Sequence, residues 1–114
     1  MLTIEKLNEY GANTTEGLER CMGNEAFYFR LIGMALMDVN FNNLKMSLEG
    51  GDLDAAFEAS HALKGVLGNL ALTPLYEKSS EICELLRSRT EMDYSPLLEE
   101  LFLRKAALDD MLAE

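Results

Sequence analysis

DLDAAFEASHALKGVLGNL, from Asp52 to Leu70, is the segment that says most about the architecture of this chain. Its apolar residues recur every three or four positions, which is the spacing of one face of an α-helix. Asp52 can cap that helix, because its side chain can accept a hydrogen bond from an otherwise unpaired N–H of the first turn. The segment therefore predicts an amphipathic helix, whose buried stripe comprises Ala56, Ala59, Ser60, Leu63, Val66, Leu67 and Leu70.

Three other long segments show the same helical spacing. The first runs from the capping residue Asn24 to about Leu48 and ends at Gly50. The other two begin at Thr73-Pro74 and Ser95-Pro96, where a capping hydroxyl precedes a proline whose missing N–H costs nothing at the first helical position. We expect the methionines and aromatic residues of the long helices to lie in the core. In the first segment the expected core positions are Phe27, Leu31, Met34, Phe41, Leu44 and Leu48.

The N-terminal residues form two shorter helical segments. Thr3 and Thr15 can cap them, and they end at Gly11 and Gly23. Because the joints between the long helices are only a few residues, neighbouring helices should run antiparallel. We predict an all-α single domain over 1-114, with short N-terminal helices in 1-23 and an antiparallel up-and-down four-helix bundle in 24-114.

The composition limits the classes of function. The 114 residues are 48% hydrophobic, which is enough for one domain with its own core. The formal charge of -10 repels the phosphate backbone of nucleic acid and anionic lipid surfaces, so neither is an expected partner. The N-terminus MLTIEKLNEY lacks the order of a signal peptide, and we expect a cytoplasmic protein. Cys21 and Cys83 lack the spacing of a redox or zinc motif, and we interpret them as core thiols.

His61 lies on the side of its helix that faces away from the buried stripe. At about 100° per residue, its side chain projects about 160° from Leu63. Gly65 and Gly68 project to the same outward half, and an interior glycine costs a helix about 1 kcal/mol relative to alanine. That cost is explained if the missing side chains give a partner access to the backbone beside His61. Close packing between helices is an equally good explanation for Gly68.

Lys64 and Phe57 add a charge and an apolar contact to this face. Lys64 follows His61 by three residues, so its ammonium can contact a group carried by the ring. A neutral imidazole is a nucleophile toward an activated phosphoryl group, and an acidic chain that handles phosphate needs a local cation. Phe57 lies one turn before His61 and suits a docking surface, with burial under the N-terminal helices as the alternative.

HALKGVLGNL, over 61–70, resembles the signature of histidine-containing phosphotransfer domains. That signature is often written as His, any residue, Leu, Lys, Gly, with a second Gly one turn later. GLERCMGNEAFYFRLI before the first long helix, and Gly51 with Asp52 before the second, also resemble the family's layout. The resemblance covers nearly the whole chain.

The resemblance implies a four-helix bundle in which His61 is phosphorylated, Lys64 steadies the phosphoryl group and Gly65 gives the partner room. It implies a phosphorelay carrier without turnover of its own. The receiver domain of a hybrid histidine kinase would donate from an aspartyl phosphate to Nε2 of His61, and a response regulator aspartate would accept the group. Magnesium would belong to the receiver, and this chain would bind no cofactor. We expect a monomer that docks transiently, through an apolar patch around His61 and the exposed edge of the first long helix.

One part of the family pattern is missing. In several members a Gln on the next helix hydrogen-bonds the histidine ring, and this chain contains no Gln. Counted back from the joint near Leu72, the residues at the height of His61 lie around Ser79 to Cys83. Ser79 or Ser80 would orient the ring, and Cys83 would do so only weakly.

Other chemistry at His61 is disfavoured by its surroundings. It is the only histidine, and no set of cysteines or carboxylates supplies a metal cage, so we expect no metal. As a general base it lacks a nucleophile, because Ser60 points about 100° away. Two alternatives use the same face: an acidic helical adaptor without phosphotransfer, and the dimerisation helices of a histidine kinase. The second needs a following ATP-binding domain, which this chain lacks unless it is a piece of a larger kinase.

Overall fold

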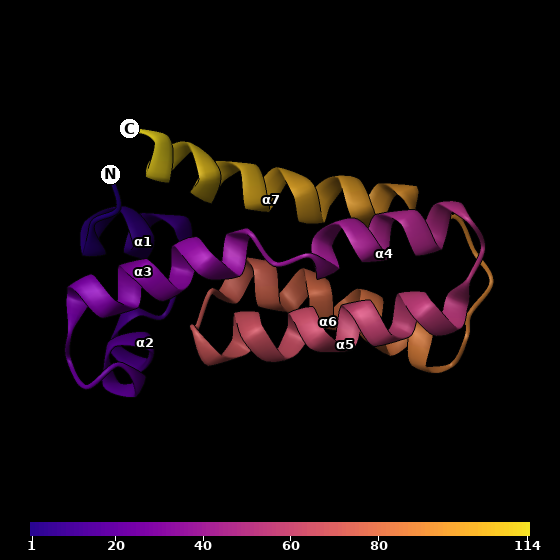
Figure 1. The fold of residues 1–114 in the computed structure, drawn as a ribbon, viewed down its shortest axis with the longest axis horizontal. Helices are drawn as coiled ribbons and strands as arrows, with labels where there is room; N and C mark the ends of the chain where they lie inside the picture. Colours follow the sequence, from indigo (N-terminus) through magenta and orange to yellow (C-terminus); the bar gives the residue numbers. More distant parts are fainter.

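Seven helices and no strands make up the computed structural model, which describes all 114 residues (Figure 1). The all-α prediction is confirmed. The helices are α1 (Ile4–Tyr10), α2 (Thr14–Arg20), α3 (Glu25–Leu36), α4 (Asn40–Glu49), α5 (Leu53–Asn69), α6 (Thr73–Arg87) and α7 (Ser95–Ala113). None of them combines the length and the apolar character that crossing a bilayer requires.

The long helices form the predicted antiparallel bundle. α5 packs against α4 on one side and α6 on the other, and α7 packs against α6 and α3. Figure 1 shows α3 and α4 following one another along α7, with α5 and α6 side by side beneath them. The joints at residues 50–52 and 70–72 are short enough to reverse the chain directly. Gly51, with φ +71°, takes the left-handed conformation that the first of these joints needs.

The single helix predicted from Asn24 to about Leu48 is wrong, because the chain breaks at residues 37–39 into α3 and α4. Oδ1 of Asp38 accepts a hydrogen bond from the backbone N–H of Asn40 at 2.8 Å. This bond stabilises a turn, and it replaces the backbone hydrogen bond that Asn40 would make in a continuous helix. The N–H of Met37 bonds to the carbonyl three residues back, at 3.1 Å, as in the tightened last turn of a helix. Apolar spacing alone does not reveal such a turn.

The buried face of α3 also differs from the prediction. Tyr28 and Ile32 are fully buried, whereas Phe27 and Met34 are exposed at 41% and 62%. α3 is apolar on most of its circumference, so helical spacing is satisfied by more than one face. The face that contains Tyr28 is the buried one, and the Tyr28 hydroxyl stabilises this orientation of α3 by donating to the carbonyl of Leu70 at 2.8 Å. The expectation that the methionines are core is wrong for the exposed residues Met34, Met37 and Met46.

Side-chain caps explain where several helices begin. Three predicted caps are confirmed, each accepting a backbone N–H at 3.0 Å: Thr3, Asn24 and Asp52. Three others are wrong, because they lie inside the first turn and not before it: Thr15, Thr73 and Ser95. Asn13 caps α2 in place of Thr15, and α6 and α7 begin without a side-chain cap.

The N-terminal helices attach to the joint between α5 and α6. The N–H of Asn13 donates to the carbonyl of Ala71 at 2.9 Å, and Nη1 of Arg20 donates to the carbonyl of Gly68 at 2.6 Å. Gly17 lets α2 pack closely against α3, since a Cβ there would lie 2.4 Å from the side chain of Tyr28. The two cysteines, Cys21 and Cys83, are free thiols buried in the interior, as predicted.

Candidate functional site

The two sides of α5 differ in burial. The predicted stripe is buried except for Val66, which is half-buried against the core. Ser60 is tolerated in it because its hydroxyl donates to the carbonyl of Phe57 at 2.9 Å. On the opposite side, His61 and Gly65 are exposed and Lys64 is half-buried. The projection of His61 to the outward side is therefore confirmed.

The His61 ring has no hydrogen-bond partner in the protein. Its nearest aromatic neighbour is Phe57, with ring centroids 5.8 Å apart and planes inclined at 40°. The three residues expected to orient the ring do not contact it through a hydrogen bond. Ser79 and Cys83 are fully buried, and the hydroxyl of Ser79 donates to the carbonyl of Tyr76 at 3.0 Å. Ser80 makes no side-chain hydrogen bond, so no side chain of α6 orients the imidazole through a hydrogen bond.

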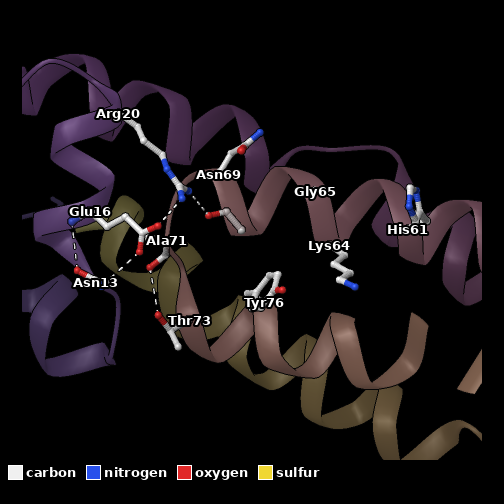
Figure 2. Close-up of a pocket in the computed structure, with 11 residues that line it drawn as sticks. Asn13, Glu16, Arg20, His61, Lys64, Gly65, Asn69, Ala71, Thr73 and Tyr76 are labelled. Atoms are coloured by element: carbon white, nitrogen blue, oxygen red, sulfur yellow. Dashed lines mark hydrogen bonds and ion pairs between the residues drawn. The ribbon is translucent and has the colours of Figure 1, made fainter. Parts of the chain in front are cut away.

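Lys64 is tied to the neighbouring helix. Its Nζ lies 3.3 Å from Oε1 of Glu84 on α6. Figure 2 shows the Lys64 side chain directed toward α6, while His61 points away from that helix. Glu84 also accepts hydrogen bonds from Nε and Nη2 of Arg87, at 3.2 and 3.4 Å. The hydrogen bonds of Arg87, followed by that of Lys64, hold the pKa of the Glu84 carboxyl below its usual range.

Two arginines that the sequence analysis missed lie beside the histidine's aromatic neighbour. The guanidinium carbons of Arg87 and Arg89 are 5.2 and 4.7 Å from the centroid of the Phe57 ring. Arg89 is held by Oδ1 of Asp54 at 2.6 Å and by the carbonyl of Leu86 at 2.8 Å. Phe57 therefore lies against the C-terminal end of α6, and the alternative that it is buried under the N-terminal helices is wrong.

The two outward glycines of α5 have different surroundings. A Cβ added at Gly65 would meet no atom within 4 Å, so the backbone there is open. A Cβ added at Gly68 would lie 3.0 Å from Cδ1 and Cε1 of Tyr76 on α6. For Gly68 the structure favours close helix packing over partner access, because that distance is shorter than an ordinary carbon contact.

A groove of about 680 Å³ runs from His61 along α5 to the N-terminal helices (Figure 2). Two cations and one carboxylate line it, and each cation is paired: Arg20 with Glu16, and Lys64 with Glu84 on α6. α2 adds Arg20 and Glu16 to the groove, which the sequence did not predict because α2 is distant from α5 along the chain. The lining residues are Asn13, Glu16, Arg20, His61, Lys64, Gly65, Gly68, Asn69, Ala71, Thr73 and Tyr76. No group of three or more His, Cys, Asp or Glu side chains is arranged for a metal ion.

The fold and the site define a helical-bundle protein with one exposed histidine beside a lysine on a bundle helix. A family model described as the Hpt domain matches residues 34–114, and the chain belongs to this histidine-containing phosphotransfer family. Members are carriers in phosphorelays that interact with receiver domains and have no turnover of their own. The match includes α4 to α7 but not residues 1–33, so it is shorter than the predicted resemblance. No curated protein and no solved structure matches the chain.

Proposed function

We propose that this phosphocarrier holds its phosphoryl group on Nε2 of His61. The observation that carries the proposal is an exposed imidazole without a hydrogen-bond partner, beside Lys64 and the open backbone at Gly65. The donor is an aspartyl phosphate on the receiver domain of a hybrid histidine kinase. The acceptor is the corresponding aspartate of a response regulator. His61 is the only histidine of the chain, so the family's chemistry has no other candidate residue.

The transfer step needs little from the chain beyond a correctly presented nucleophile. The lone pair of Nε2 attacks phosphorus while Nδ1 keeps its proton, and the P–O bond to the aspartate breaks as the carboxylate leaves. Lys64 stabilises the charge on the phosphoryl oxygens after transfer. We assign the magnesium ion and the acidic pocket to the receiver. The reverse reaction, with a second receiver, passes the group on.

The surroundings of α5 support a shallow docking surface. Gly65 leaves space for a loop of the receiver next to the imidazole. Exposed methionines lie on the first two bundle helices: Met34 shares a hollow with Val66 of α5, and Met46 shares another with Ala55. A small apolar edge of this kind suits transient association of a monomeric carrier.

The proposal is tested by incubating the chain with a radiolabelled, phosphorylated receiver domain. The wild type should acquire an acid-labile label, and His61→Gln should acquire none. Lys64→Ala should retain less label than the wild type, because the phosphoryl charge is then less stabilised. Lys6→Ala is the matched control, since Lys6 pairs with Glu114 and not with any residue of the site. Equal labelling of the wild type and His61→Gln would reject the proposal, and an acidic adaptor without phosphotransfer would give no label on either.

A further inference from the structure

Lys64 has one ionic partner, and that partner holds it away from the histidine. Its Nζ is 3.3 Å from Oε1 of Glu84, across the boundary between α5 and α6. His61, three residues earlier on α5, makes no hydrogen bond to it. The four-carbon stem of a lysine lets the ammonium swing between two such positions. A phosphoryl group on His61 would therefore draw the Lys64 ammonium away from Glu84, because the Lys64 side chain is directed toward α6 and the ring points away from that helix (Figure 2).

Glu84 has a second cation that remains when Lys64 leaves. Arg87, three residues later on α6, donates to both carboxylate oxygens at 3.2 and 3.4 Å. The carboxylate is thus still paired after the exchange, and it stays ionised near neutral pH because its pKa is lowered mainly by Arg87. Of the other charges near this face, Asp54 and Arg89 pair with each other, whereas Glu58, three residues before His61 on α5, is exposed and makes no ion pair. The arrangement allows Lys64 to leave Glu84 without leaving that carboxylate unpaired.

We propose that Glu84 is a positioning residue that competes with the phosphoryl group on His61 for Lys64. This rests on the proposed role of His61. In the unphosphorylated chain, Glu84 holds Lys64 toward α6. In the phosphorylated chain, the contact with Glu84 must be given up, which subtracts from the stabilisation that Lys64 gives to the phosphoryl group. Glu84 therefore keeps that group easier to pass on, as a carrier requires.

The test uses the whole chain and a small phosphodonor, so no partner is needed. Phosphoramidate transfers its phosphoryl group to Nε2 of His61: the N–P bond to the ring forms, the N–P bond of phosphoramidate breaks, and ammonia leaves. The pH titration of the ³¹P chemical shift then gives the second pKa of the bound phosphoryl group. A closer ammonium lowers this pKa by favouring the dianion.

The variant is Glu84→Gln, which keeps the shape of the side chain and removes its charge. We expect the phosphoryl pKa to fall by about 0.5, equivalent to about a threefold tighter hold on the dianion. Glu81→Gln is the matched control, because Glu81 lies on the same helix and pairs only with Lys78. It should leave the titration unchanged. Thermal unfolding followed by circular dichroism checks that both variants fold.

A second background separates the role of Lys64 from simple charge repulsion. In Lys64→Ala, the same Glu84→Gln substitution should move the phosphoryl pKa by less than half as much. An equal shift with and without Lys64, or no shift in either background, would overturn the proposal for Glu84 while leaving His61 as the acceptor. If phosphoramidate labels the wild type and His61→Gln equally, the assignment of His61 itself fails, and the proposal for Glu84 fails with it.

Discussion

The two sides of α5 differ in what their residues contribute to the fold. On the inward side, Leu63 and Leu67 are fully buried in the core, where their volume is fixed by their neighbours. On the outward side, Gly65 weakens the helix and has open space where a side chain would lie, while His61 has no hydrogen-bond partner. The inward residues therefore hold the fold together, and the outward residues contribute little to its stability. The four predictions that follow test this separation, from the largest expected effect to the smallest.

Leu63→Ala should lower the free energy of unfolding by about 2–5 kcal/mol, because it removes buried volume from a packed core. Urea unfolding measures the change. Molecules that remain folded should still accept label from a phosphorylated receiver, since the outward side is intact. A loss of stability well below this range would mean that the inward side of α5 does not hold the fold together.

Gly65→Leu should slow phosphoryl transfer without lowering the stability of the fold, the reverse of Leu63→Ala. No atom lies within 4 Å of a Cβ at this position, so the fold should be retained. Transfer from a phosphorylated receiver should slow on the order of tenfold to a hundredfold, because a displaced partner loses the alignment that the reaction needs. Rapid-quench kinetics with circular dichroism measures both properties. Normal transfer by a folded Gly65→Leu variant would refute the access argument.

Alkaline pH should weaken the inward packing through Tyr28. Burial, followed by the nearby Cys21, raises the pKa of the Tyr28 hydroxyl to about 12, from 10.0. The unfolded chain therefore loses this proton at a lower pH than the folded chain, and the stabilisation present below pH 10 is lost as the pH rises from 10 toward 12. Urea unfolding at a series of alkaline pH values should show the decline. Tyr28→Phe should be less stable at pH 8 and flatter above pH 10; an unchanged slope would argue against the assignment.

Alanine at the two outward glycines should separate their roles. Gly65→Ala should raise the free energy of unfolding by up to about 1 kcal/mol, because alanine is the better helix former and the site is open. Gly68→Ala should gain less or lose stability, because its Cβ would press on the ring of Tyr76 at 3.0 Å. Thermal unfolding of the two variants in parallel makes the comparison. If Gly68→Ala were the more stable variant, the packing role of Gly68 would be wrong.

The sequence predicted the inward and outward sides of α5 because a regular helix fixes the direction of every side chain. The cap at Asp52 and the burial of Leu63 follow from the same local rules. The break between α3 and α4 was not predictable in this way. It depends on a turn at Asp38 that competes with the helix, and the apolar spacing continues through it.

The surroundings of His61 were predictable only within its own helix. Lys64 and Gly65 follow from their spacing on α5. Glu84 and Arg87 belong to α6, and their contacts depend on how far α6 is shifted along α5 and rotated toward it, which a single sequence does not specify. The same limit explains why Ser79 was expected at the ring, although it is buried and bonded within its own helix.

The most direct test of the central claim is to locate the phosphoryl group after transfer. The wild-type chain is incubated with a phosphorylated receiver, and the modified residue is identified by mass spectrometry under conditions that preserve phosphohistidine. We predict one phosphoryl group, on His61, which is lost to a fresh unphosphorylated receiver and is absent from His61→Gln. A phosphoryl group on any other residue, or its persistence in His61→Gln, would contradict the account.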